Sequence, residues 1–208
     1  MSTERIIIMG GGGNSEESYG LDYQYLTRFG IKSILYIPIA LDCDDIGYEK
    51  CYEWIVGWVT KLSPRFINID ICTDLSETID LLQYDSIYIG GGNTYKLLYQ
   101  IKKYKWDTKL TDFYRQGGVI YGGSAGAIIL GKSILTVPSE YLGLINQYDT
   151  DGLNLVEQLV RCHYNRDRDN HHLNKYLIDL SAKLSTPLLL IEEDSGAIFI
   201  NEVREKLI

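Results

Sequence analysis

Three short apolar runs in this 208-residue sequence each lead directly into a cluster of glycines. The runs and clusters are 5–9 before 10–13, 86–89 before 90–92, and 118–121 before 122–126. A short run that is apolar throughout is typical of a strand buried on both faces of a parallel sheet. Glycines after such strands permit tight turns and close approach of the backbone to a ligand. We therefore expect a functional site at the carboxyl edge of a parallel sheet.

Strand-like and helix-like segments alternate along most of the chain. Further strands are expected at 33–37, 66–72, 188–191 and 197–201, with an extended segment at 153–162. Helices are expected at 15–29, 44–62, 75–82, 95–103, 107–116, from 125 onward, and at 170–184. This alternation predicts an α/β protein with helices on both faces of a mostly parallel central sheet. Without a repeat or a linker, one domain over residues 1–208 is expected.

The composition argues against several classes of function. Hydrophobic residues make up 45% of the chain, which suffices for a full core, and a net charge of −8 disfavours nucleic acid as a partner. No apolar run approaches the ~20 residues of a membrane helix, and we interpret residues 1–10 as a first strand rather than a leader. The four cysteines are scattered without a CxxC pair, which is typical of a reduced, cytoplasmic protein. No metal or cofactor is expected, and both a monomer and a homodimer remain open.

The segment 122–126 carries the clearest chemical signal. Gly122, Ser124 and Gly126 form the pattern G-x-S-x-G between a predicted strand and a predicted helix, which is the context of a nucleophile elbow. Such a turn strains the central residue and excludes large flanking side chains. The Ser124 hydroxyl would project above the sheet, and the Ala125 N–H could donate to an oxyanion. The alternative is a plain glycine-rich turn with a solvated serine.

The glycines at 90–92 are a second candidate for a role in catalysis. In a hydrolase, Gly91 or Gly92 would supply the second oxyanion donor, because free N–H groups after a strand can point at an anion. Asn93 and Gly123 are the expected substrate contacts beside these donors. The alternative for this segment is a tight turn that ends in a helix N-cap at Asn93 or Thr94.

The glycines at 10–13 invite comparison with a dinucleotide site. They lack the G-x-G-x-x-G spacing, and no clear acidic residue follows a strand about 20 positions later. We expect a turn that lines the substrate, or a plain loop, rather than a nucleotide site.

A serine nucleophile needs a general base, and the sequence contains three histidines. His163 follows the extended segment 153–162, so it is the best placed to reach Ser124 at a strand end. His171 and His172 lie in a polar stretch that opens a helix, which is typical of solvated side chains.

The base in turn needs a carboxylate that orients it. The predicted strand at 188–191 runs directly into Glu192, Glu193 and Asp194, and spacing alone does not choose among them. The alternative is an ordinary acidic turn. The order serine, histidine, acid also differs from the serine, acid, histidine order of α/β-hydrolases.

Taken together, five segments resemble peptidase family S51, whose members include aspartyl dipeptidase (peptidase E) and cyanophycinase. They are 89–98, 122–127, 151–155, 162–165 and 190–197. The resemblance implies a flavodoxin-like three-layer sandwich similar to class I glutamine amidotransferases. It also implies a Ser–His–Glu triad of Ser124, His163 and Glu193, with Glu192 as the fallback for the acid. The implied oxyanion donors are Gly91 or Gly92 and Ala125.

Two departures from the family pattern concern the substrate. Aspartyl dipeptidases have a bulky aromatic residue before the serine, where this chain has Gly123. A basic residue that would hold an aspartate side chain has no clear position either. Arg161, Arg166 and Arg168 are candidates, because a guanidinium binds both oxygens of a carboxylate; the alternative is a solvated charge run.

Three functions are compatible with these features. The first is a serine peptidase that cleaves short peptides, among them dipeptides with an N-terminal aspartate, through an acyl-enzyme. The second is a non-catalytic domain that binds a small anion at the glycines after residue 89. The third is an isopeptidase or amidohydrolase similar to cyanophycinase. A small peptide is the expected partner in the first.

Overall fold

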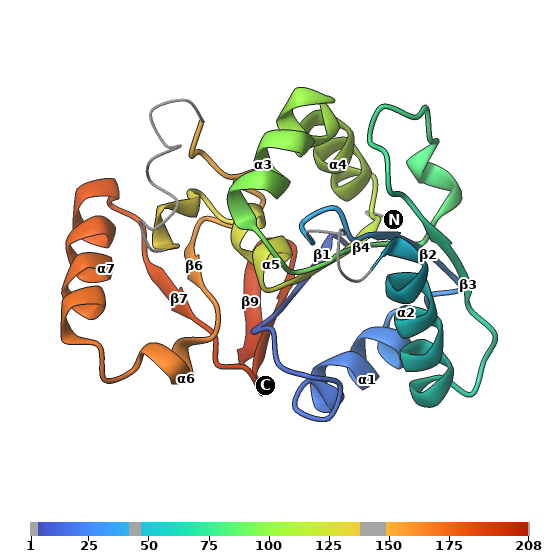
Figure 1. Cartoon of the computed structure of the whole chain (residues 1–208), viewed down its shortest axis with the longest axis horizontal. Coiled ribbons are helices and arrows are strands. Elements are labelled where there is room, and N and C mark those ends of the chain that lie inside the picture. Colours follow the sequence, from blue (N-terminus) through green and yellow to red (C-terminus); the bar gives the residue numbers. More distant parts are fainter. Residues whose placement is uncertain (1–3, 42–46, 138–148, 208) are drawn as a thin grey trace.

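The computed structural model describes residues 4–41, 47–137 and 149–207. Its centre is a seven-stranded sheet with the order β3-β2-β4-β5-β1-β8-β9 (Figure 1). The strands are β1 (Ile6–Gly10), β2 (Ser33–Ile37), β3 (Asn68–Ile71), β4 (Ser86–Ile89), β5 (Val119–Gly123), β8 (Gly196–Ile200) and β9 (Val203–Leu207). The first five are mutually parallel, whereas β8 and β9 are antiparallel to their neighbours. The predicted mostly parallel sheet is thereby confirmed.

Helices cover both faces of this sheet, so the molecule is the α/β sandwich that the sequence predicted (Figure 1). One face is covered by α1 (Tyr19–Arg28) and α2 (Tyr48–Leu62). The other face is covered by α3 (Thr94–Lys103), α4 (Trp106–Arg115) and α5 (Ala125–Leu130). Among the described residues, no helix is long and apolar enough to span a bilayer.

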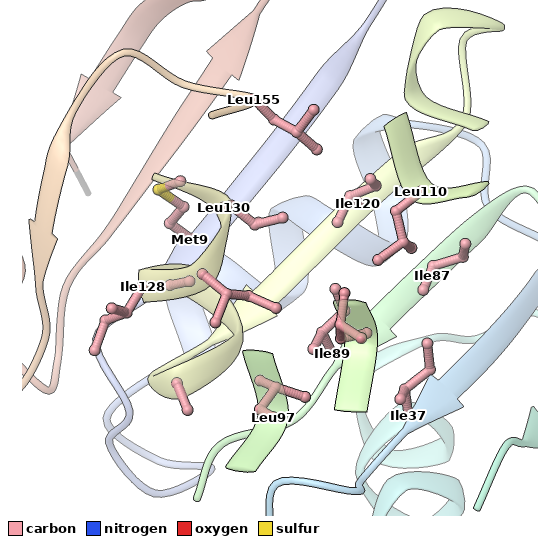
Figure 2. Close-up of a cluster of buried hydrophobic side chains, with 14 of the residues drawn as sticks. Met9, Ile37, Ile87, Ile89, Leu97, Leu110, Ile120, Ile128, Leu130 and Leu155 are labelled. Atoms are coloured by element: carbon pink, nitrogen blue, oxygen red, sulfur yellow. The ribbon is translucent and has the colours of Figure 1, made fainter. Parts of the chain in front are cut away.

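Each face of the sheet has its own hydrophobic core. In Figure 2, Ile37, Ile89 and Ile120 from the strands lie close to Leu97 and Leu110 from the helices. Alternate strand residues point to the opposite face and meet α1 and α2 in a second cluster. Because both faces are buried, the strands are apolar throughout, which is the pattern that made them recognisable in the sequence.

The first helix begins later in the chain than expected. It begins at Tyr19 instead of residue 15, because the Asn14 side chain accepts hydrogen bonds from the N–H groups of Glu16 and Glu17 and forms a turn. The second is observed from Tyr48, and the start predicted at residue 44 falls within 42–46, outside the described residues.

The helix predicted at 75–82 is wrong. The structure has turns there and a single 3₁₀ turn, η1 (Leu81–Gln83). The side chain of Asp74 accepts a hydrogen bond from the Ser76 N–H, and that of Asp80 accepts one from the Leu82 N–H. Such local bonds satisfy the backbone without a helix.

The C-terminal third differs from the prediction in its strand pairing. β6 (Leu159–Arg161) and β7 (Leu188–Leu190) form a separate two-stranded parallel sheet, with α6 (Tyr164–Asp167) and α7 (His171–Leu184) between them in the chain. The strand predicted at 188–191 therefore does not close the central sheet, and the extended segment contains only one short strand. β9 was not predicted, because this edge strand is rich in charged residues and lacks an apolar run.

Candidate active site

Ser124 lies in the turn between β5 and α5, where the G-x-S-x-G pattern predicts it. Its φ of 48° and ψ of −108° lie outside the regions that non-glycine residues ordinarily occupy. A Cβ on Gly122 would lie 2.6 Å from the Ala127 nitrogen, and one on Gly126 would lie 2.2 Å from the Ile89 carbonyl oxygen. Both positions therefore require glycine, and the tight turn holds the serine at the carboxyl edge of the sheet.

His163 follows β6 and reaches this edge from outside the central sheet. Its N–H donates to the Gly11 carbonyl over 3.1 Å, and its Nε2 lies 2.8 Å from the Ser124 Oγ. Gly12 makes the approach possible, because a Cβ there would lie 2.5 Å from the imidazole Cε1 and 2.8 Å from the Ser124 Cβ. The glycine cluster after β1 thus makes room for the contact between serine and histidine.

Glu193 is the acidic residue after β7 that contacts the imidazole. Its Oε1 lies 2.9 Å from the His163 Nδ1, its Oε2 accepts a hydrogen bond from the Asn165 amide over 3.1 Å, and Arg166 forms an ion pair with it. These partners, the His163 hydrogen bond first, lower the pKa of Glu193 from 4.5 to about 2, although partial burial acts in the opposite direction. The carboxylate is therefore ionised at neutral pH and can accept a hydrogen bond from the imidazole Nδ1–H.

The three arginines near the histidine are all engaged in ion pairs. The pairs are Arg161 with Asp167, Arg166 with Glu193, and Arg168 with Glu192. Glu192, the fallback for the acid, thus contacts a guanidinium. None of the three arginines is among the described residues that line the pocket beside Ser124.

A pocket of about 480 Å³ opens beside Ser124. Its described lining consists of Gly12, Tyr36, Leu41, Lys50, Cys51, Trp54, Gly91, Gly92, Ser124 and His163. A Cβ on Gly91 would lie 3.2 Å from the Ser124 Cβ, and one on Gly92 would lie 2.4 Å from the Ala40 carbonyl oxygen. The backbone after β4 therefore borders the serine, and Ala125 begins α5 directly after it.

Asn93 and Gly123, the expected substrate contacts, instead lie against other residues of the protein. The Asn93 side chain caps α3 by accepting a hydrogen bond from the Lys96 N–H over 3.0 Å. A Cβ on Gly123 would lie 3.2 Å from the Tyr88 hydroxyl. Neither residue is among the described residues that line the pocket.

Cys162 precedes the histidine but is a poor nucleophile. Its side chain is 1% exposed, and burial raises the pKa of its thiol to about 12. Because the thiolate is the reactive form, this cysteine is inert at neutral pH.

Sequence reasoning missed the roles of Gly12 and Asn165 and the aromatic side chains that line the pocket. Asn165 lies in the segment 162–165 that carries part of the family resemblance, whereas Gly12 was interpreted as part of a turn that lines the substrate or of a plain loop, without a role beside the histidine. The sequence feature that could have indicated this aromatic lining is a pair of tryptophans one helical turn apart, Trp54 and Trp58.

Comparisons with known sequences identify the same family that the motifs indicated. A peptidase E of Shewanella putrefaciens is 31% identical over 167 residues, which cover 78% of this chain and 68% of that protein. An uncharacterized peptidase of Listeria innocua is 29% identical over 146 residues, which cover 64% of this chain and 65% of that protein. The chain thus matches about two thirds of the length of these relatives.

Solved structures share the fold. A protein of Listeria monocytogenes EGD-e, provisionally described as a peptidase E, superposes with a TM-score of 0.72 at 19% identity and covers 99% of this chain and 98% of its own. A peptidase from an acI-B1 actinobacterium also gives 0.72, at 18% identity, over 100% of this chain and 88% of its own. The sequence profile of Peptidase family S51 matches residues 6–208. Since this match covers nearly the whole chain, the protein is a member of Peptidase family S51.

Proposed function

We propose that this chain is a serine-type peptidase that cleaves short peptides through an acyl-enzyme. The observation that carries the proposal is the continuous set of contacts from the Ser124 hydroxyl through the His163 imidazole to the Glu193 carboxylate. A non-catalytic anion site would need the glycine backbone, but it would have no use for these ordered contacts.

The first half of the reaction follows from the position of the three groups. With the Nδ1–H donating to Glu193, the His163 Nε2 is free to accept the hydroxyl proton as Ser124 attacks the peptide carbonyl. The Glu193 carboxylate stabilises the imidazolium that forms. The oxyanion lies against the backbone, with Ala125 and Gly91 or Gly92 as donors.

The second half regenerates the serine. The imidazolium gives its proton to the leaving amine, so that the C–N bond breaks and an ester to Ser124 remains. Water then attacks this ester while His163 accepts a proton from it, and the imidazolium returns that proton to the Ser124 Oγ as the ester C–O bond breaks and the acid product leaves. The half-buried site and its pocket suit a short, unfolded substrate better than a folded protein.

Substitution of the nucleophile tests the proposal. Ser124→Ala should lower kcat/KM for cleavage of a dipeptide panel by at least about a thousandfold, because no acyl-enzyme can form. Mass-spectrometric detection of released amino acids measures the loss, and circular dichroism checks the fold. Hydrolysis at the wild-type rate by this variant would refute the proposal. An intact wild type that cleaves no peptide or isopeptide and takes up no fluorophosphonate would favour the anion-binding alternative.

A further inference from the structure

Two aromatic side chains and one leucine form an apolar wall of the pocket beside Ser124, which is called the aromatic wall below. Tyr36, Leu41 and Trp54 line it there. The Trp54 side chain is 43% exposed, although it is a large apolar ring. An apolar ring exposed inside a concave site is typical of a surface that receives a ligand.

The wall is held in place from behind. The Trp54 ring stacks on Trp58 with centroids 5.8 Å apart, and it also packs against Tyr36 and Tyr88 at 6.1 Å and 6.3 Å. The Trp58 Nε1 donates to the buried Asp22 carboxylate over 2.9 Å, which fixes this second ring. Since the wall is preformed, a ligand that packs on it loses little free energy to ordering the protein.

The order of the strands tells which part of a peptide faces the wall. Ser124 follows β5, whose neighbours in the sheet are β1 and β4. On the β1 side, the backbone after the strand holds His163; on the β4 side lies Gly91, and β2 with Tyr36 lies one strand further. The imidazole must reach the leaving amine, so the amine half of the substrate lies on the β1 side. The acyl half then extends toward β2 and the aromatic wall.

The charges of the pocket lining restrict which substrate side chains the pocket can bind. Among the described lining residues none is acidic, and one is a lysine, Lys50. A lysine or arginine of the substrate would find no carboxylate partner in this part of the chain. An aspartate could meet Lys50, but contact with the apolar wall would remove part of the water around its carboxylate, which costs free energy.

We propose that this pocket binds an aromatic or bulky aliphatic side chain of the residue whose carbonyl is attacked, with Trp54 as the contact that determines specificity. The assignment rests on the proposed function, because the acyl half is defined by cleavage at Ser124. Gly123 borders the same aromatic cluster, since a Cβ there would lie 3.2 Å from the Tyr88 hydroxyl.

Dipeptide kinetics test the proposal. For the wild type, we expect kcat/KM for Phe–Ala to exceed that for Asp–Ala by about tenfold or more. Trp54→Ala should lower the ratio of Phe–Ala to Ala–Ala by roughly 10- to 100-fold, and Trp54→Phe should restore most of it. Phe66→Ala is the matched control, because Phe66 is 90% exposed and lies outside the pocket lining. A wild-type preference for Asp–Ala that Lys50→Met abolishes would overturn the proposal, as would an unchanged ratio in Trp54→Ala.

A binding measurement separates this inference from the proposed function. In Ser124→Ala, calorimetry should give tighter binding of Phe–Ala than of Asp–Ala, and the added change Trp54→Ala should remove the difference. If the wild type cleaves nothing and takes up no fluorophosphonate, the proposed function fails, and calorimetry still decides the pocket. Equal binding of the two dipeptides, or tighter binding of Asp–Ala, would overturn the pocket assignment.

Discussion

The nucleophile and its two partners differ in what surrounds them. Ser124 precedes α5, a six-residue helix in which every residue is buried, and it follows a central strand. His163 and Glu193 come from the small β6–β7 sheet, where α6 has no buried residue. A few backbone hydrogen bonds connect this second region to the glycines after β1, among them Gly13 N–H to the Glu193 carbonyl over 3.1 Å. β6 and β7 also contribute buried residues to the core that α5 packs into, so packing places all three backbones, and specific hydrogen bonds then direct the side chains of the base and the acid.

This contrast predicts that removal of the imidazole lowers activity far more than stability. His163→Ala should lower kcat/KM by about a thousandfold or more, because the serine loses its general base. Its thermal midpoint should stay close to that of the wild type, since the side chain is half-buried and outside both cores. His171→Ala, at an exposed helix start, is the control. A large fall in the thermal midpoint of the first variant would break the distinction.

Substitutions at the elbow around Ser124 should lower the free energy of unfolding. Gly126→Ala places a methyl group 2.2 Å from the Ile89 carbonyl oxygen, so we expect a loss of roughly 1–3 kcal/mol in the free energy of unfolding in urea. Activity should fall with it, because the elbow must shift. Gly57→Ala in α2 is the matched control: its new Cβ meets no atom within 4 Å, and helix propensity predicts a gain of up to about 1 kcal/mol. Equal effects of the two substitutions would contradict the role of packing at the elbow.

Substitution of the acid should have an effect on stability that depends on pH. The pKa of Glu193 is lowered to about 2 from 4.5, so its ionised form stabilises the folded state fully above pH 4.5, and this contribution is lost as pH falls toward 2. The difference in unfolding free energy between the wild type and Glu193→Gln should be constant from pH 7 to about 5.5 and then shrink steadily on acidification. Urea titrations at several pH values measure it. A difference that is the same at pH 3 and pH 7 would show that the carboxylate has no such partners.

The same contrast explains what could be predicted from the sequence. The elbow is a local pattern, and the strands around it are apolar throughout because both faces are buried, so Ser124 and the central sheet were recognisable. The imidazole contacts a serine 39 residues earlier and a carboxylate 30 residues later, and no local pattern encodes either distance. The choice between Glu192 and Glu193 depends on which way a turn directs its side chains.

Elements that depend on packing between distant segments were the ones that the sequence did not reveal. Trp54 lies on a helix that is amphipathic in the sequence, and only the packing of that helix beside β2 directs the ring into the pocket. The β6–β7 pairing depends on how the C-terminal third folds back. Gly12 is a single glycine among four, and its importance follows from the imidazole that lies against it.

The central claim is that Ser124 is a nucleophile activated by His163. Peptide mapping by mass spectrometry after reaction with a fluorophosphonate tests it most directly. We expect a single adduct on Ser124 in the wild type, and a reaction at least about a hundredfold slower in His163→Ala. An adduct on another residue, or an equal rate of labelling in the two proteins, would contradict the account.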